Sequence, residues 1–448
     1  MASRHRVLKW LVVPLIILLL LGLLLGGGLL LFLPVQTEVV IERLLPWLDR
    51  LPKEPYVQNP SPTAITIVYE ADTPGRGTVK YTTGRHFDQT APAALFQEIQ
   101  HGKGTTYLYR ARLASLRPAT QYKYRVVHEP QGQLPAKSRI AWFQTWPDGP
   151  DPITFIAYGD SRTSPEPHAV IAHQFEQYHP AFILHTGDAI GSADPYDQWE
   201  VQFFEPLEAT IGETPLFFAR GNHDGPPEDM LRWFETPSGR TWYSFTCGPV
   251  HVAVLDCYVN TSEFRDWLDR DLAQSEAPWK IVMYHEPTFD FGGHLSHWGR
   301  DLLPIFAKHR VDVVLAGHSH LYERFVPLRL TDSSDHATTF ITTGGGGAGL
   351  YKIAPHPLLV KAESTHHYCV FEADTDRLAM RALTPRGQEI DRFTITKAGG
   401  QGDEDAPPPA KPVEAAIMAQ GIIEAETGAA HPADPAPAKS VDTPGHRP

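Results

Sequence analysis

The chain has 448 residues, of which 42% are hydrophobic and 10% aromatic. This composition excludes a wholly disordered chain, and the length is typical of about three structural units. A formal net charge of −13 argues against nucleic acid as the main partner, and three cysteines are too few for a disulfide scaffold.

The N-terminus is predicted to be a single-pass membrane anchor. No charged residue occurs from Trp10 to Thr37, and a helix of that length spans a hydrocarbon core of ~30 Å. Because Arg4, Arg6 and Lys9 precede the run, everything after it is predicted to lie outside the cytoplasm. A cleaved signal peptide, which would leave the protein secreted, and a buried core helix are the alternatives. The anchor is favoured because the run is long and no A-x-A-like site follows it.

Residues 55–148 show the period-two alternation of β-strands. Ile65, Ile67 and Tyr69 alternate with polar residues, and turns rich in Pro and Gly separate the runs. The stretch from Leu116 to Tyr122 resembles the tyrosine corner of a fibronectin type III sandwich. We find no catalytic constellation here, so this domain is predicted to be a spacer or to position its neighbour.

Residues 150–397 alternate strands with helices instead, which predicts an α/β domain with functional groups at the carboxyl ends of its strands. The predicted strands are Ile153–Tyr158, Phe182–His185, Leu216–Ala219, Ile281–Tyr284 and Val311–Leu315. The predicted helices are Pro167–Tyr178, Ser262–Gln274 and Arg300–His309.

The final 51 positions, 398–448, are predicted to be a disordered tail. They contain 12 Ala and 9 Pro and no aromatic residue, so they bury too little apolar surface to offset the entropy of ordering. Only Val413–Glu426 has the composition of a short helix.

Each of the five predicted strands of the α/β domain is followed by a polar turn. The turns are Gly159-Asp160, Gly187-Asp188, Gly221-Asn222-His223-Asp224, His285-Glu286 and Gly317-His318-Ser319-His320. Glycine lets the backbone turn tightly just past a strand, and carboxylate, amide and imidazole groups together suit Zn, Mn or Fe. One such turn is common, whereas five in succession are highly specific.

On these motifs, residues 153–397 resemble the calcineurin-like metallophosphoesterase family, whose pattern runs GD, GD, GNH[DE], H, GHxH. The preceding β domain, Tyr322-Glu323-Arg324 and the glycine-rich stretch Thr342–Leu350 make the purple acid phosphatase branch the most similar. The resemblance implies an α/β four-layer αββα sandwich with a centre of two divalent or trivalent metal ions.

The resemblance also assigns roles. Its ligands would be Asp160 and His320 for the first metal, Asn222, His285 and His318 for the second, and Asp188 bridging both. Two such ions lower the pKa of a bound water for attack on phosphorus and neutralise the phosphoryl oxygens. His223 would donate a proton to the leaving alkoxide, with Asp224 orienting it.

The first-metal site departs from the family pattern. Ordinary members have His two residues after the first Asp, where this chain has Arg162; the purple branch has Tyr three residues after the second Asp, where it has Gly191. We therefore expect a weaker first site and no purple tyrosinate colour. His168 and Tyr196 are candidate substitutes. Arg162 is expected to assist catalysis by binding the substrate phosphate through its planar guanidinium, a structural ion pair being the alternative.

His294 and His297 lie in the glycine-rich loop after the fourth predicted strand. In related enzymes such a loop often carries substrate-contacting histidines, so both are candidate substrate-binding residues. A solvated loop without a function is an equal alternative.

The sequence thus predicts a membrane-anchored phosphoesterase that hydrolyses phosphate mono- or diesters outside the cytoplasm. A non-catalytic surface module, with a structural metal site and a partner-binding β domain, is the alternative. His223 favours the enzyme, since a structural metal site needs no proton donor; the missing first-metal ligand favours the module. The predicted units are 1–37 (cytoplasmic residues and anchor), 38–54 (connector), 55–148 (fibronectin type III-like domain), 150–397 (phosphoesterase domain) and 398–448 (tail).

Overall fold

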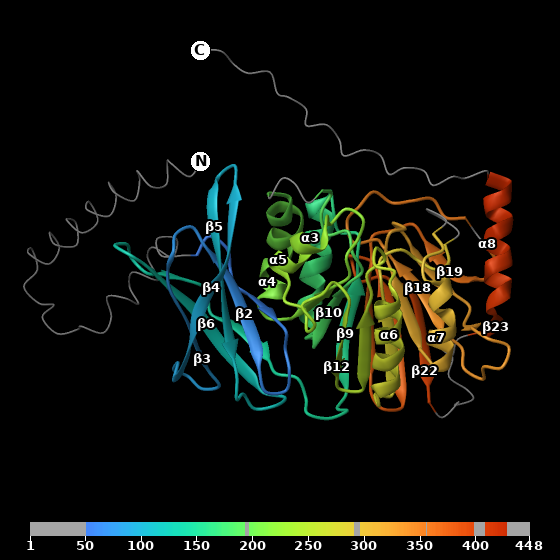
Figure 1. Ribbon diagram of the computed structural model, residues 1–448, viewed down its shortest axis with the longest axis horizontal. Coiled ribbons are helices and arrows are strands. Elements are labelled where there is room, and N and C mark those ends of the chain that lie inside the picture. Colours follow the sequence, from blue (N-terminus) through green and yellow to red (C-terminus); the bar gives the residue numbers. More distant parts are fainter. Residues whose placement is uncertain (1–50, 193–196, 291–295, 355, 398–407, 428–448) are drawn as a thin grey trace, which may run out of the picture.

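The computed structural model describes residues 51–192, 197–290, 296–354, 356–397 and 408–427 (Figure 1). The predicted anchor, most of the predicted tail, Tyr196 and His294 lie outside the described residues. Across these described ranges no helix combines the length and the apolar character needed to cross a membrane.

The N-terminal domain is all β, as predicted. Its strands are β1 (Tyr56–Gln58), β2 (Ile65–Ala71), β3 (Gly75–Thr82), β4 (Gln89–His101), β5 (Gly104–Leu113), β6 (Gln121–Pro130), β7 (Ala136–Lys137) and β8 (Ala141–Gln144). They pair in the order β1-β2-β5-β4-β3-β6-β7, with β8 also on β6. The long β4 pairs with β5 over one part of its length and with β3 over another, so it joins the two sides of the domain. The tyrosine corner forms, because the Arg117 N–H donates to the Tyr122 hydroxyl at 3.0 Å.

Two sheets stand back to back in the second domain. The first has the order β11 (Leu216–Phe218), β10 (Phe182–His185), β9 (Ile153–Tyr158), β20 (Tyr368–Ala373), β21 (Arg377–Leu383), β22 (Glu389–Thr396). The second has the order β12 (Tyr243–Cys247), β13 (Val250–Val254), β14 (Trp279–Met283), β15 (Val313–Ala316), β18 (Thr339–Thr343), β16 (Tyr322–Phe325), β19 (Leu359–Glu363). Parallel pairing of β9, β10 and β11, and of β13, β14, β15 and β18, brings their carboxyl ends to one edge.

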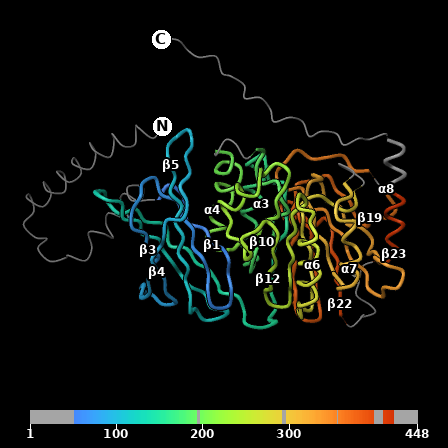
Figure 2. The backbone as a smooth tube through the Cα atoms, in the orientation of Figure 1, coloured from blue at the N-terminus to red at the C-terminus, as the bar shows by residue number. Residues whose placement is uncertain are grey.

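Helices cover the outer face of each sheet, which makes the four layers predicted (Figures 1 and 2). Strand alternation shows this for β14: Ile281 and Met283 lie in the core between the sheets, whereas Val282 packs in the outer core with α6. The covering helices are α3 (Pro165–Phe175), α4 (Glu205–Ile211) and α5 (Pro227–Trp233) on one side, and α6 (Ser262–Gln274) and α7 (Leu303–Lys308) on the other.

A buried lysine joins the two domains. Lys53 is only 6% exposed and forms ion pairs with Glu70 of β2 and with Glu200 of the π-helical segment η2 (Trp199–Phe204), the latter at 2.7 Å. Its ammonium lies 3.7 Å from the centre of the Phe204 ring. Because β2 faces the second domain with its outer side, all seven of its residues are buried.

The predicted disorder of the tail is wrong for its middle part. Helix α8 (Val413–Thr427) forms over the stretch expected to be helical, and β23 (Lys411–Pro412) pairs with β17 (Leu328–Arg329). Val413 and Ala416 are buried in the outer core beside α7. One apolar helix face and a short backbone pairing therefore supply the burial that composition alone does not reveal.

Candidate metal centre

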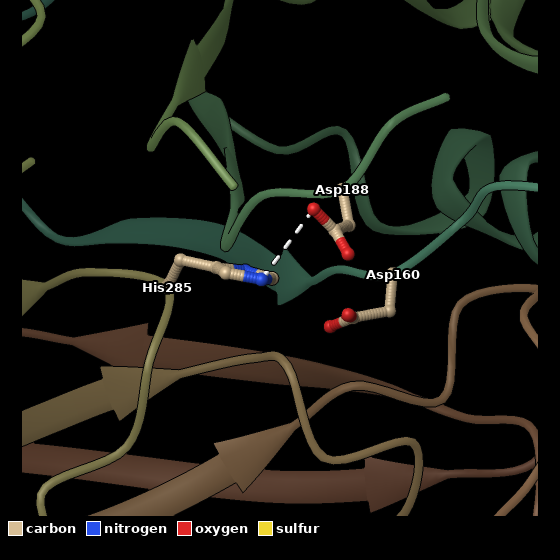
Figure 3. A group of neighbouring side chains, drawn as sticks. All are labelled: Asp160, Asp188 and His285. Atoms are coloured by element: carbon tan, nitrogen blue, oxygen red, sulfur yellow. Dashed lines mark ion pairs between the residues drawn. The ribbon is translucent and has the colours of Figure 1, made fainter. Parts of the chain in front are cut away.

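Three buried side chains from three strand ends form a metal-binding group. Asp160 follows β9, Asp188 follows β10 and His285 follows β14, and Figure 3 shows them pointing toward one another. One ligand atom from each lies within 4.8 Å of the other two. His285 Nε2 is 3.4 Å from Asp188 Oδ1.

The backbone at these strand ends is held in an uncommon conformation. Asp160, Asp188 and His318 have φ values of 55°, 56° and 66°, in the left-handed region that residues other than glycine rarely adopt. The glycines nearby are required because a side chain would clash there, and Gly187 also has a positive φ of 106°. A Cβ on Gly221 would lie 2.1 Å from Asp188 Oδ1, and one on Gly187 would lie 2.5 Å from His285 Nδ1.

Three of the predicted second-metal ligands converge. Asn222 Oδ1 lies 3.0 Å from His285 Nε2 and 3.1 Å from His318 Nδ1, and the two imidazole nitrogens are 3.2 Å apart. His285 Nδ1 lies 2.9 Å from the carbonyl of Thr186, which can only accept a hydrogen bond. Nδ1 therefore carries the hydrogen, and the lone pair of Nε2 is directed at the group, as in metal-ligating histidines.

The first-metal ligands also meet. His320 Nδ1 donates to the carbonyl of Gly349 at 2.7 Å, which leaves the Nε2 lone pair 3.5 Å from Asp160 Oδ1. That carboxylate oxygen is buried and has no hydrogen-bond partner among the described residues. Burial and the Asp188 charge raise the pKa of Asp160 well above its usual range. An orphaned, desolvated carboxylate oxygen beside a nitrogen lone pair fits a bound cation.

The expected role of Asp224 needs a correction. Its buried carboxylate accepts hydrogen bonds from the N–H groups of Asp188, Ala189 and Gly221 at 2.8, 2.9 and 2.7 Å, so it orients backbone rather than His223. Burial, with the nearby Asp188 charge, raises the pKa of Asp224 to about 6.

A backbone carbonyl orients His223 instead. Its Nδ1 lies 2.8 Å from the carbonyl oxygen of Gly191, and its Nε2 lies 4.0 Å from Asp188 Oδ2. The imidazole thus presents Nε2 to the centre. The Gly191 backbone, at the position where the purple branch has its tyrosine, performs this orientation.

Arg162 points into the centre. Its Nε lies 3.2 Å from Asp188 Oδ2, and its Nη2 lies 3.4 Å from His320 Nε2. The guanidinium therefore contacts Asp188 and His320, two of the expected metal ligands, and Arg162 stands at the position where ordinary members of the family have a histidine.

His168 is not a substitute ligand. It is fully buried on α3, with Nε2 3.0 Å from the Tyr158 hydroxyl and Nδ1 2.9 Å from the Gln202 carbonyl. Both nitrogens are used within the protein core. His297 is exposed and lines a cavity next to the centre, and the described contacts do not place it on the metal ligands.

Two further residues of the centre carry no sequence motif. His185, the last residue of β10, has Nε2 3.0 Å from the Ser161 hydroxyl and accepts a hydrogen bond from the Gly187 N–H at 3.2 Å. Tyr351 stacks on His320 with ring centres 4.2 Å apart. The position of His185 at the end of a predicted strand was a signal that could have identified it. The position of Tyr351 directly after the glycine-rich stretch was a weaker signal.

His168 gives a testable pH dependence. Burial lowers its pKa to about 4, whereas an unfolded histidine titrates near ~6.5. The unfolded chain therefore binds the extra proton between these values, so the free energy of unfolding should fall as the pH drops from ~6.5 toward 4, by at most ~3 kcal/mol from this residue.

Urea unfolding of the metal-free protein between pH 4 and 7 measures this change. His168→Gln should flatten the dependence and leave metal content unaltered, with His173→Gln, an exposed position on the same helix, as the control. Loss of a metal equivalent in His168→Gln would show that the residue is a ligand after all.

Comparisons with known proteins agree with the geometry. Residues 159–322 match the calcineurin-like phosphoesterase family model, and residues 52–145 match that of the purple acid phosphatase N-terminal domain. The Fe(3+)-Zn(2+) purple acid phosphatase 12 of Arabidopsis thaliana is 26% identical over 321 residues, which cover 61% of this chain and 66% of that protein, slightly under two thirds. An uncharacterised protein of Mycobacterium tuberculosis is 27% identical over 365 aligned residues. The match covers 65% of this chain and 68% of that protein.

The fold also has a solved counterpart. The purple acid phosphatase PPD1 from yellow lupin (Lupinus luteus) seeds superposes with a TM-score of 0.69 at 19% identity, covering 81% of this chain and 78% of that one. Both domains and the strand-end motifs thus agree in one assignment. The chain therefore contains a calcineurin-like phosphoesterase domain preceded by a purple acid phosphatase N-terminal domain, and it is similar to purple acid phosphatases.

Proposed function

We propose that this phosphoesterase hydrolyses phosphate mono- or diesters at a centre of two cations held by the strand-end residues. The observation that carries the proposal is the convergence of Asp160, Asp188 and His285 on one buried point, with His223 and Arg162 at its rim. When bound, two cations neutralise phosphoryl oxygens and acidify a water for attack on phosphorus. The donor set suits Zn, Mn or Fe, with Asp188 bridging the two sites.

The ligands of the two sites differ in number. Asn222, His285 and His318 would hold the second cation with the bridging carboxylate, whereas only Asp160 and His320 join that carboxylate at the first. Fewer protein ligands imply a first cation that binds more weakly and exchanges faster.

His223 acts as the general acid. The Gly191 carbonyl fixes the hydrogen on Nδ1, so the protonated imidazole can release a proton only from Nε2, the nitrogen directed at the centre. That proton would go to the alkoxide oxygen as its bond to phosphorus breaks, so the leaving group departs as a neutral alcohol.

Arg162 binds the substrate phosphate. Its side chain is 13% exposed and lies between Asp188 and His320, so its planar donors reach both ligands and the space above them. A guanidinium can donate two parallel hydrogen bonds to phosphate oxygens. Its positive charge also helps to neutralise the phosphate when the first site holds its cation only weakly.

His223→Ala should lower the turnover of an alkyl monoester such as glycerol 2-phosphate by ~10²–10⁴-fold, because the leaving alkoxide loses its proton donor. Metal content should stay at the wild-type value, since His223 is assigned no ligand bond. A 2,4-dinitrophenyl ester, whose leaving group needs no proton, should lose much less rate. His173→Ala is the control. If His223→Ala loses a metal equivalent, His223 is a ligand and not a proton donor. If the wild-type protein is inactive with Mn²⁺ or Zn²⁺, the result favours the non-catalytic module.

Arg162→His should restore the family's ordinary ligand and raise the occupancy of the first site after dialysis, as measured by elemental analysis. Arg162→Gln removes the charge without adding a ligand, so it separates the two effects. Both variants should raise the KM for p-nitrophenyl phosphate through the lost phosphate contact. Two metals that resist mild chelation equally in the wild-type protein would contradict this account.

We also propose that the catalytic domain lies outside the cytoplasm. The support is the basic residues Arg4, Arg6 and Lys9 ahead of an uncharged run. Protease added to intact spheroplasts of an expressing bacterium should digest the catalytic domain, whereas a cytoplasmic control protein should survive. Full protection of the domain would overturn this orientation.

A further inference from the structure

A cavity of about 410 Å³ is lined by Glu286, the residue directly after the ligand His285. Asn260 lies in the loop after β13, and Glu286 directly follows the ligand His285 at the end of β14, so both belong to the edge of the sheet that carries the metal ligands. The opposite wall is the segment 296–302, which contributes Trp298 and Arg300.

This wall is held by a residue that lies 120 positions from Arg300 in the sequence. The side-chain amide of Gln420, on α8, donates to the Ser296 carbonyl at 2.7 Å, and its oxygen accepts from Arg300 Nη2 at 2.7 Å. Both halves of the amide are thus used, and both bonds end on residues that line the cavity.

The place of Gln420 in its helix is specific. Val413, Ala416 and Gln420 lie on one face of α8, and all three are buried, with Gln420 at 0% exposure. Val413 and Ala416 pack in the outer core, and an apolar residue at position 420 could pack there in the same way. A buried amide is stable only when hydrogen bonds satisfy it, and the Gln420 amide meets this condition by binding the segment 296–302.

We propose that Gln420 is a positioning residue of the active site, and that the cavity whose wall it fixes receives the second organic group of a phosphate diester, the one that does not leave. The proposal rests on the proposed function, since it takes the phosphate to lie at the metal centre. A cavity with an indole wall and with carboxylate, amide and guanidinium groups suits an organic group that has an apolar surface and polar substituents. The second ester group of a diester has this character, so α8 selects among esters.

The test compares Gln420→Ala with Gln420→Glu and with Met418→Ala, a control on the exposed side of the same helix. Kinetics with p-nitrophenyl phosphate and bis-p-nitrophenyl phosphate should separate the two substrates. Gln420→Ala should raise the KM of the diester about tenfold, the scale of a lost buried hydrogen bond, and raise the KM of the monoester by a clearly smaller factor. Gln420→Glu keeps the acceptor for Arg300, so its KM for the diester should lie between those of the wild type and Gln420→Ala. The metal content should be the same in all variants.

Cleavage by trypsin after Arg300 provides a readout that needs no activity. The loosened wall of Gln420→Ala should be cut about tenfold faster than wild type or Met418→Ala. Equal cleavage rates in all variants, or equal kinetic losses for both substrates, would overturn the proposal. A wild-type protein that hydrolyses neither substrate would refute the proposed function, while the cleavage rates would still decide whether Gln420 holds the wall.

Discussion

The metal centre is kept in shape by one buried carboxylate, that of Asp224. Its three backbone hydrogen bonds join the loop after β10, which carries Asp188, to the loop after β11, which carries Asn222. A buried charge is tolerated only when such donors replace water. On the other side, Gly346 and Ala348 donate to the carbonyls of Gly159 and Asp160, so the loop after β9 is fixed in the same way. Backbone hydrogen bonds therefore hold together the loops whose ligand side chains contact one another, as Asn222, His285 and His318 do.

The strands that end in ligands were predictable because local chemistry marks them. β9, β10 and α6 have the bounds predicted, and Asp160, Asp188 and His285 come together as the polar turns after their strands indicated. The strands β20, β21 and β22 end in no such motif. β20 joins the sheet by pairing with β9, over 200 residues earlier, and β21 and β22 then follow by antiparallel pairing. The role of Asp224 was mispredicted for the same reason, since its partners are backbone groups that only the folded chain brings near.

The departures at Arg162 and Gly191 have local compensation that the sequence does not show. A Cβ at Gly191 would lie 3.2 Å from Gln198 Oε1, and the Gly191 N–H donates to Gln202 Oε1 at 2.8 Å. The Gly191 carbonyl lies 2.8 Å from His223 Nδ1, and the Arg162 guanidinium contacts Asp188 and His320. Both positions therefore make contacts within the centre that only the folded chain reveals.

The ligand loops also bind one another directly through the backbone. The His318 N–H donates to Asp160 Oδ2 at 2.8 Å, and both residues have left-handed backbone. The loops after β9 and β15 therefore hold each other in position. Removing the Asp160 carboxylate would then disturb the His318 backbone as well as delete a proposed metal ligand.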